Sequence, residues 1–415
     1  MIKKIYYKYL KVKLFFFSLI NFYKILKIKF KEKKYIIVFD ISDPQFNDFL
    51  EPVIRETINL TNNKKFCIFF SLYEKDIRSK KIKEEYFIRY GINNFIILEF
   101  LRLNFLIDFF FTAHFYSRAS KLTLSINIPR GVGKWFVPPK NFFQNFDVHF
   151  STGYLHKQQI NDSIKIYNIK KKIKIFDIGF PKLDLIRKKN NLFNINKIKN
   201  KNYLNKNNFT ILLSPAWEKG MILDDYGYIL AEKILISLKN INLIVKLHPS
   251  SLVNKNHQDY QLLTQGKNWK KEFSKLKKFK NFKFYEETNS NEIMIIADIM
   301  ITDVSSIAYE FLSLRKPVLY YDSPMFYEHY QYLLYKQYQN KKKFIGNPRL
   351  NPRINCGRNY GRVFKDISEL ISLLKFYVSK NTIKNFKLKK TNSIFFNEGK
   401  SIIALKESLI EIFKL

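Results

Sequence analysis

Short runs of apolar residues alternate along the chain with longer stretches in which apolar residues return every three or four positions. In the first half, such runs predict strands at 35–40, 66–71 and 95–100, separated by helix-like segments at 45–60 and 78–90. In the second half, the predicted strands are 209–214, 242–247, 282–285, 299–302 and 317–321, and the predicted helices are 226–239, 268–279, 290–296 and 306–314. This alternation predicts an α/β protein whose mostly parallel sheets are covered by helices on both faces.

The alternation is interrupted at 191–208, a polar Asn- and Lys-rich run without clear periodicity, which we interpret as an interdomain linker. It separates two predicted doubly wound, Rossmann-like domains at 35–190 and 209–380. The remaining residues are an N-terminal segment, 1–34, and a C-terminal region, 381–415. A chain of 415 residues has room for two domains with a core each.

One aromatic segment, 100–116, does not follow the regular alternation. Arg102 and Asp108 interrupt it, and charged residues are costly inside a bilayer. We therefore expect a buried or interfacial helix here and not a membrane span.

The N-terminal segment 1–34 combines aromatic residues with many lysines. Its lysine-free part, 14–23, has about half the length that crosses a bilayer, and no signal-peptide cleavage site follows it. Several apolar residues fall near one helical face: Leu10, Leu14, Phe17, Ile25 and Ile28. This pattern predicts a helix lying on an anionic membrane surface. The alternative is a first helix docked on the protein, with its lysines in solvent.

Composition narrows the class of protein without identifying a partner. The 46% hydrophobic and 17% aromatic content excludes a disordered chain. A net charge of +38 would attract nucleic acid, anionic lipid or phosphate-bearing polymers, although an A/T-rich genome would also enrich lysine. Two cysteines cannot form a disulfide framework, so we predict a reducing compartment. The six histidines show no metal-ligand spacing, and we predict no protein-held metal and no cofactor.

Polar side chains follow the predicted strand 299–302. Asp303, Ser305 and Ser306 stand between this strand and the next predicted helix, and Glu310 follows one turn later. Backbone N–H groups and hydroxyls at such a junction can receive a phosphate, and a carboxylate can bind a ribose. The alternative, in which these residues only cap the helix, is compatible with binding.

A second predicted strand end, at 242–247, is also polar. It carries Lys246, His248, Pro249 and Ser250, and the proline keeps His248 outside any following helix. Ligands of open α/β sheets lie at the carboxyl ends of the strands, so His248 is a candidate for binding or catalysis. The two strand ends together predict a nucleotide-diphosphate site.

The first half contains a basic, glycine-containing loop after a predicted strand that ends at Pro129. Arg130, Gly131, Gly133 and Lys134 form this loop. Glycine lets a backbone approach a ligand closely, and Arg or Lys neutralises phosphate. Arg130 and Lys134 are therefore candidate catalytic residues.

At five places the sequence resembles the CDP-glycerol glycerophosphotransferase family, the teichoic-acid primases and polymerases. The similar segments are KLHPSS at 246–251, ITDVSSIAYEFLSLRKPVLYYD at 301–322, IGFPKLDLI at 178–186, ILLSPAW at 211–217 and GRVFKDISELISLL at 361–374. The resemblance covers roughly residues 120–410, and sugar transferases and epimerases of related fold share parts of it.

The resemblance implies a GT-B fold, in which two Rossmann-like domains face each other across a cleft and a C-terminal helix, here 402–415, returns to the first domain. It implies an enzyme that moves glycerol phosphate, or a related polyol phosphate, from a CDP-linked donor to a hydroxyl of a lipid-linked polymer acceptor and releases CMP. His248, Ser305 and Ser306 would hold the diphosphate, Glu310 the ribose, and Asp303 would orient the loop. The enzyme would act at the cytoplasmic face of the membrane, in teichoic acid-like or capsule synthesis.

One position departs from the family pattern. Arg130 stands where the family typically has the histidine that is proposed to deprotonate the acceptor, and arginine is no base at neutral pH. Either another group is the base, the match is shifted, or activity has changed. Nearby histidines are His114, His149 and His156, of which His149 lies in an apolar strand typical of a core.

Three alternatives stay open from the sequence. A nucleotide-sugar transferase or epimerase of the same fold would use another donor. A membrane-bound binding protein would bind nucleotide without consuming it, in keeping with Arg130. A nucleic-acid binder would show a steep salt dependence, but the sequence holds no recognition motif, so we predict no nucleic-acid partner.

Overall fold

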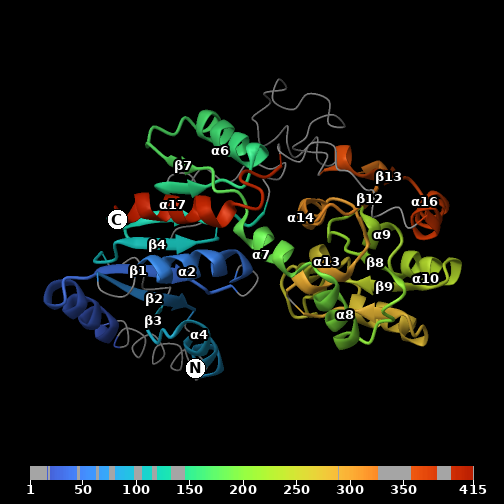
Figure 1. Cartoon of the computed structure of the whole chain (residues 1–415), viewed down its shortest axis with the longest axis horizontal. Coiled ribbons are helices and arrows are strands. Elements are labelled where there is room, and N and C mark those ends of the chain that lie inside the picture. Colours follow the sequence, from blue (N-terminus) through green and yellow to red (C-terminus); the bar gives the residue numbers. More distant parts are fainter. Residues whose placement is uncertain are drawn as a thin grey trace. The chain divides into compact units, whose positions relative to one another are not determined.

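The computed structural model describes residues 16, 19–43, 47–61, 65–73, 80–97, 105–114, 119–131, 145–287, 289–325, 357–380 and 394–414. They belong to two compact units, each built on one parallel sheet (Figure 1). Unit 1 comprises residues 1–130, 138–182 and 396–415, and unit 2 comprises residues 131–137 and 183–395. The predicted α/β class with parallel sheets is confirmed.

The sheet of unit 1 has the strand order β3-β2-β1-β4-β5-β6-β7, and every neighbouring pair is parallel. Its strands are β1 (Tyr35–Asp40), β2 (Phe66–Leu72), β3 (Phe95–Ile97), β4 (Phe109–Thr112), β5 (Leu124–Asn127), β6 (Val148–Phe150) and β7 (Lys174–Phe176). Strands β2 and β3 are added on one side of β1, and strands β4 to β7 are added on its other side. The strand order therefore reverses between β1 and β4.

Helices cover both faces of this sheet. They include α2 (Asn47–Thr61), α4 (Lys80–Tyr90), α6 (Tyr154–Ile166) and the C-terminal helix α17 (Ser401–Phe413). Figure 1 shows α17 beside α2, although the two are about 340 residues apart in the chain. At the end of α17, the ring of Phe413 lies 5.3 Å from that of Phe66 and 5.0 Å from that of Phe109. The last helix is thus part of the core of unit 1.

The segment 100–116 contains a strand and not the predicted helix. Within it the structure describes residues 105–114, and β4 occupies Phe109–Thr112, with Phe110 and Phe111 fully buried. A short apolar run fits a buried strand and a buried helix equally well, and here pairing with β1 and β5 decides between them.

The described part of the N-terminal segment docks on unit 1. Residues 19–26 are helical and continue into a π-helical turn, η1 (Lys27–Lys31). Ile25 and Ile28 are buried in a cluster with apolar residues of β1, β2 and β4, and Lys29 is paired with Asp108. The prediction that Ile25 and Ile28 face a membrane is therefore wrong, because both side chains are buried against the sheet of unit 1. Leu10, Leu14 and Phe17 lie outside the described residues.

The sheet of unit 2 has the order β10-β9-β8-β11-β12-β13, again with parallel neighbours. The strands are β8 (Phe209–Leu213), β9 (Ile241–Val245), β10 (Phe282–Phe284), β11 (Ile299–Thr302), β12 (Val318–Tyr321) and β13 (Arg362–Phe364). The larger helices around it are α10 (Tyr228–Ser237), α12 (Trp269–Ser274), α13 (Asn291–Ile296), α14 (Ile307–Ser313) and α16 (Ile367–Lys380). Shorter helical elements are α9 (Ile222–Asp225), η4 (Pro249–Leu252), α11 (Tyr260–Thr264), η5 (Lys275–Lys278) and η7 (Arg358–Tyr360). In unit 2 the order reverses between β8 and β11.

The predicted linker 191–208 contains a helix, α8 (Leu192–Lys201). Asn191 caps it by accepting a hydrogen bond from the backbone N–H of Asn194, at 3.0 Å. The helix packs against α13, with Ile195 and Ile198 half-buried. Asn and Lys give little helical periodicity, so this contact, which the sequence does not reveal, stabilises α8. Before it, α7 (Pro181–Lys189) carries the chain from unit 1 into unit 2.

Candidate functional site

The carboxyl ends of β9, β8 and β11 lie side by side in unit 2, because β8 pairs with both of the others. The reversal of strand order falls between β8 and β11. In doubly wound sheets, ligands bind at the carboxyl ends of the strands beside such a reversal. Most of the predicted donor-binding residues therefore occupy the edge of the sheet where a ligand is expected.

Asp303 joins the loops after β8 and β11. Its carboxylate is fully buried and accepts backbone N–H bonds from Ala216 (2.8 Å), Val304 (2.6 Å) and Ile222 (3.1 Å). Burial raises the pKa of Asp303 to about 6, against the opposing effect of these bonds. Asp303 thus fixes the backbone of the Pro-x-Trp loop that follows β8.

Ser305 and Ser306 precede α14, and both are partly exposed. Ser306 is the N-cap residue, but its side chain makes no capping hydrogen bond, and none of the three donors to Asp303 belongs to α14. The side chains of Asp303 and Ser306 therefore do not cap α14. Glu310, one turn into α14, is only 5% exposed.

His248 lies at the turn after β9, on the other side of β8. It is exposed and has an extended backbone, and Pro249 starts the short helix η4 directly after it. The ring Nδ1 accepts a hydrogen bond from the backbone N–H of Ser250, at 3.2 Å. A neutral imidazole that accepts at Nδ1 carries its proton on Nε2.

Lys246, in contrast, turns inward. It is 7% exposed, its ammonium lies 6.0 Å from the centre of the Tyr285 ring, and burial lowers its pKa while the charge of Glu287 raises it. This partly desolvated ammonium adds positive charge at the carboxyl end of β9.

Arg130 lies in unit 1, just after β5. Burial lowers the pKa of Arg130 to about 10, and the nearby charge of Asp43 raises it. The side chain is therefore still a cation at neutral pH and does not serve as a base. Lys134 and Gly133 lie outside the residues that the structure describes.

Two of the three histidines near Arg130 in sequence are core residues. His149, in β6, is fully buried, and burial lowers its pKa to about 3. His156, in α6, is 9% exposed, its Nδ1 accepts from the backbone N–H of Thr152, and burial lowers its pKa to about 4. The interpretation of His149 as a core residue is confirmed, and it extends to His156.

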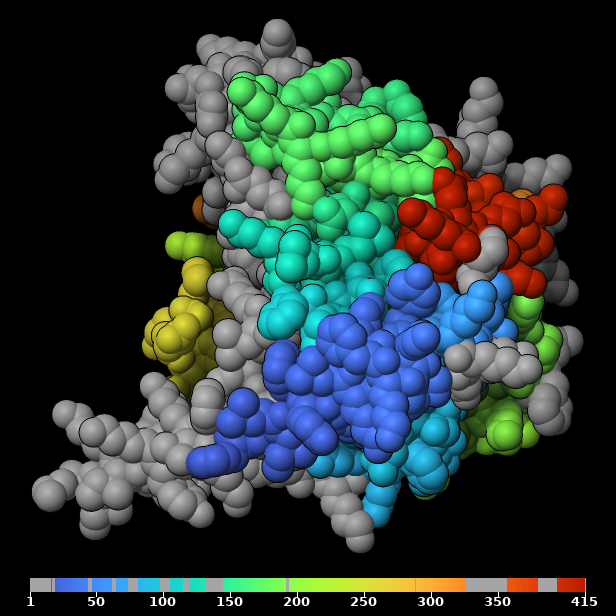
Figure 2. Space-filling model, turned by 90° about the vertical axis from the view of Figure 1, so that its left-hand side faces the viewer, coloured from blue at the N-terminus to red at the C-terminus, as the bar shows by residue number. Residues whose placement is uncertain are grey.

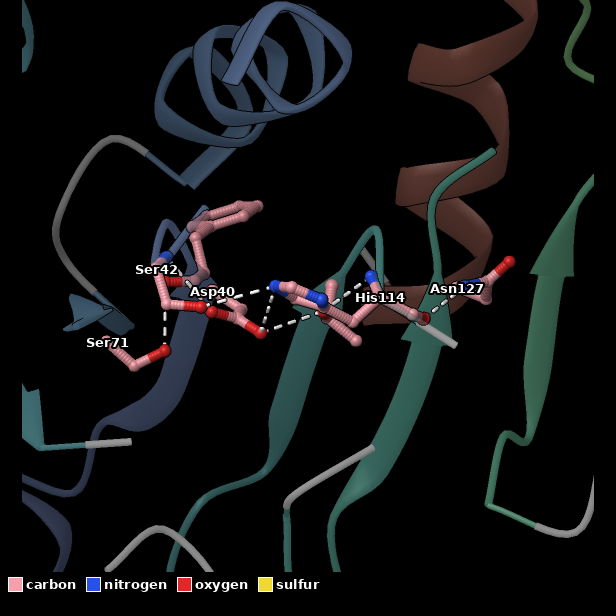
Figure 3. A network of polar contacts seen from close by, with 7 residues as sticks. Asp40, Ser42, Ser71, His114 and Asn127 are labelled. Carbon is pink, nitrogen blue, oxygen red and sulfur yellow. Dashed lines mark hydrogen bonds and ion pairs between the residues drawn. The ribbon is translucent and has the colours of Figure 1, made fainter. Parts of the chain in front are cut away.

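A polar cluster lies at the strand reversal of unit 1. Of its residues, the sequence pattern singled out only His114. The cluster consists of Asp40, Ser42, His114 and Asn127, which are labelled in Figure 3, together with Thr112. The carboxylate of Asp40, at the end of β1, accepts bonds from the Thr112 hydroxyl (2.9 Å) and the Ser42 backbone N–H (3.1 Å). The signal was present, since the apolar run 35–40 ends in a carboxylate.

No group of three or more His, Cys, Asp or Glu residues suited to a metal ion occurs in the part of the chain that the structure describes.

Comparisons with known proteins agree on one family. The family model for CDP-glycerol:poly(glycerophosphate) glycerophosphotransferase matches residues 144–400, more than half of the chain, and begins after the Arg130 loop. A teichoic acid poly(glycerol phosphate) polymerase of Bacillus spizizenii is 29% identical over 145 residues, which is 34% of this chain and 34% of that protein. The match thus spans about a third of this relative's length.

Among solved structures, the wall teichoic acid polymerase TagF is similar with a TM-score of 0.57 at 13% identity, covering 96% of this chain and 98% of that one. A putative UDP-N-acetylglucosamine 2-epimerase from Listeria monocytogenes has a TM-score of 0.55 at 11% identity, covering 92% and 97%. At such identities the likeness shows the fold alone, which is that of GT-B proteins. The family match is independent of it, and the chain belongs to the CDP-glycerol:poly(glycerophosphate) glycerophosphotransferase family.

Proposed function

We propose that the protein transfers glycerol phosphate, or a related polyol phosphate, from a CDP-linked donor to a hydroxyl of a membrane-associated, lipid-linked acceptor and releases CMP. The product would be a surface polymer of the teichoic acid or capsule type. The observation that carries the proposal is the strand reversal of unit 2, where Asp303, His248 and the two serines lie at the edge expected to bind ligand, within the region matched by the family model.

The geometry of His248 supports a role in holding the donor diphosphate. His248 is exposed at the end of β9, and because Nδ1 accepts from Ser250, a neutral ring carries its proton on Nε2, the atom that would donate to a phosphate oxygen. Ser305 and Ser306 follow β11, which pairs with β8 on the side opposite β9, and Lys246 supplies positive charge. These groups would stabilise the charge that develops on the departing CMP, without any side chain becoming covalently modified.

The experiment is a comparison of donors. The purified protein is incubated with CDP-glycerol, and in parallel with UDP-sugars, together with a synthetic lipid-linked glycerol phosphate acceptor, and the released nucleotide is measured. Release of CMP is the expected result. Release of UDP instead would place the protein with nucleotide-sugar enzymes, and nucleotide binding without release would make it a binding protein.

We propose further that the N-terminal helix binds an anionic membrane surface through the face that points away from unit 1. Figure 2 shows residues 19–31, in dark blue, on the surface of that unit. Large apolar side chains here stay exposed: Phe16 (60%), Ile20 (67%), Tyr23 (73%) and Phe30 (68%). Lys24, Lys27 and Lys31 are exposed among them. Aromatic and apolar groups with interspersed lysines suit an interface with anionic lipid. None of the helices described is long and apolar enough to span a bilayer.

A triple variant, Ile20→Ser with Tyr23→Ser and Phe30→Ser, tests this surface and leaves the buried Ile25 and Ile28 in place. It should lose most of its cosedimentation with phosphatidylglycerol vesicles. The matched control is Ile88→Ser, which changes an apolar residue that is 83% exposed on α4. Equal vesicle binding by the triple variant and the wild-type protein would refute the assignment. Deleting the whole segment would be less informative, since it also removes core residues.

A further inference from the structure

A cavity of about 680 Å³ lies at one edge of the sheet of unit 1. Its wall is formed by residues of the segments 119–125, 145–147 and 168–171, which lead into β5, β6 and β7. Because these three strands are parallel, the cavity lies at their amino ends. The polar cluster that contains Asp40 and His114 lies at the opposite, carboxyl ends of strands in this sheet, where ligands of doubly wound sheets usually bind. The amino-end cavity is therefore a second, separate place on unit 1.

The wall of this amino-end cavity carries more positive than negative charge. Its charged residues are Asp147, Lys121, Lys170 and Lys171. Asp147 is paired with Lys171 at 2.8 Å, and its second carboxylate oxygen accepts the backbone N–H of Ser125 at 2.8 Å. Lys121 and Lys170 are exposed, and neither is paired with a carboxylate in the part of the chain that the structure describes. Two ammonium groups are therefore available to an anion in the cavity.

Hydrogen bonds to both neighbouring strands fix Asp147 in the wall. Its backbone N–H donates to the carbonyl oxygen of Ser125 at 2.9 Å, and its own carbonyl oxygen accepts from the backbone N–H of Lys174 at 2.9 Å. This part of the wall is thus held in one arrangement by the sheet itself. A preorganised wall lowers the cost of ordering side chains when a ligand binds.

Thr123 adds a hydrogen-bonding group to the wall. It is 3% exposed, and its hydroxyl has no hydrogen-bond partner among the described residues. Because this hydroxyl has already lost its contact with water, a ligand oxygen beside it would gain a hydrogen bond at little further cost. The other hydroxyl and amide side chains of the wall are Ser120, Ser125, Asn145 and Asn168. Hydroxyls and amides suit the hydroxyl groups of a polyol, and ammonium groups suit phosphate.

We propose that the amino-end cavity binds a chain of glycerol phosphate units, the polymer that the proposed transfer extends; this inference rests on the proposed function. Lys121 and Lys170 neutralise phosphate groups of the chain, and the hydroxyl and amide groups contact its glycerol hydroxyls. Sites for small ligands have volumes of about 300 to 1,000 Å³, so the cavity accommodates a short stretch of the chain. The bound stretch is one that does not react, because the cavity lies at the edge of the sheet away from the carboxyl ends of its strands.

A second basic cavity, of about 440 Å³ beside β10 in unit 2, fits such a chain less well. Its wall includes Lys271 and Lys277, but also the half-buried rings of Phe282 and Phe284, which offer no hydrogen bond to a polyol hydroxyl. Both lysines are exposed. They therefore provide a control that removes the same amount of charge from another basic cavity.

The test measures, by calorimetry at one salt concentration, how a soluble synthetic oligomer of glycerol phosphate binds to the full-length protein. The variant is Lys121→Ser with Lys170→Ser, and thermal unfolding first establishes that it is folded. A hydrogen bond to a charged group contributes about tenfold in affinity, so this double variant should bind the oligomer at least about tenfold more weakly. The control, Lys271→Ser with Lys277→Ser, should stay within about twofold of wild type, because exposed charges away from a ligand contribute little. Both variants should bind CDP-glycerol as the wild-type protein does.

The outcomes separate this inference from the proposed function. Equal weakening of oligomer binding in both double variants overturns the inference, since it indicates attraction to net charge alone. Wild-type protein that binds the oligomer no more tightly than inorganic phosphate also overturns it, because no chain is then recognised. A Lys121 and Lys170 variant that keeps oligomer binding but loses binding to phosphatidylglycerol vesicles overturns it in favour of a lipid headgroup. Oligomer binding that depends on these two lysines, in a protein that never releases CMP from CDP-glycerol, supports the cavity and overturns the proposed function alone.

Discussion

The buried carboxyl of Asp303 makes the unfolding free energy of unit 2 depend on pH. The variant Asp303→Asn, which removes the titrating group, tests this dependence. Burial raises the pKa of this carboxyl to about 6, while an unfolded chain leaves it near 3.9. The folded state therefore binds this proton more tightly than the unfolded state does. The contribution of the bound proton to the unfolding free energy is complete below about pH 4 and is lost as the pH rises through about 6. Two pKa units correspond to about 3 kcal/mol of unfolding free energy.

Asparagine removes this titration but keeps the shape of the side chain. Its amide oxygen can still accept from Ala216 and Val304, while its NH₂ group faces the N–H of Ile222, a mismatch worth about 1 to 3 kcal/mol. That cost applies at every pH. The unfolding free energy of the variant relative to wild type should therefore rise by about 2 kcal/mol between pH 4 and pH 7.

The assay is urea unfolding at pH 4, 5, 6 and 7, followed by tryptophan fluorescence, to which Trp269 contributes from the core of unit 2, where it is 2% exposed. Asp366→Asn is the control, since Asp366 is exposed and caps α16 through an oxygen that asparagine keeps. A difference between Asp303→Asn and wild type that stays constant from pH 4 to pH 7 would refute the reasoning about burial.

Two further predictions concern the cores of the units. Phe413→Ala should lower the unfolding free energy of unit 1 by about 3 to 5 kcal/mol, because the ring packs among Phe66, Phe109 and Phe111; an unchanged Tm would contradict this. In unit 2, the Lys316 ammonium donates to three backbone carbonyls of α13 and its C-cap, and burial lowers its pKa to about 8. Wild-type stability should therefore rise by about 2 kcal/mol between pH 8 and pH 10 relative to Lys316→Met, and parallel pH profiles would contradict it.

Much of the fold was predictable because strands buried on both faces of a parallel sheet are continuous apolar runs. β1, β9 and β11 follow such runs closely, and the polar residues directly after them mark the edge of each sheet. The candidate donor residues were found in this way, since a polar strand end is visible in one dimension. Whether they bind a nucleotide stays a prediction.

The parts that the sequence did not reveal depend on contacts between distant segments. β4 is a short aromatic run that becomes a strand only by pairing with β1 and β5, and α8 is stabilised by packing on α13. Ile25 and Ile28 have the spacing of a membrane-facing helix, yet they cover the sheet of unit 1. The pairing of Asp40 with His114 joins residues 74 positions apart through the strand order, which periodicity does not predict.

The most direct test of the central claim, a donor site at the strand reversal of unit 2, is CMP release by His248→Ala with CDP-glycerol and the lipid-linked acceptor. One preorganised donor to the developing charge is worth about 2.7 to 4 kcal/mol, so the account predicts a loss of at least about a hundredfold in turnover, with unfolding unchanged because the side chain is exposed. A folded His248→Ala protein that releases CMP at close to the wild-type rate would remove His248 from the site and contradict the account.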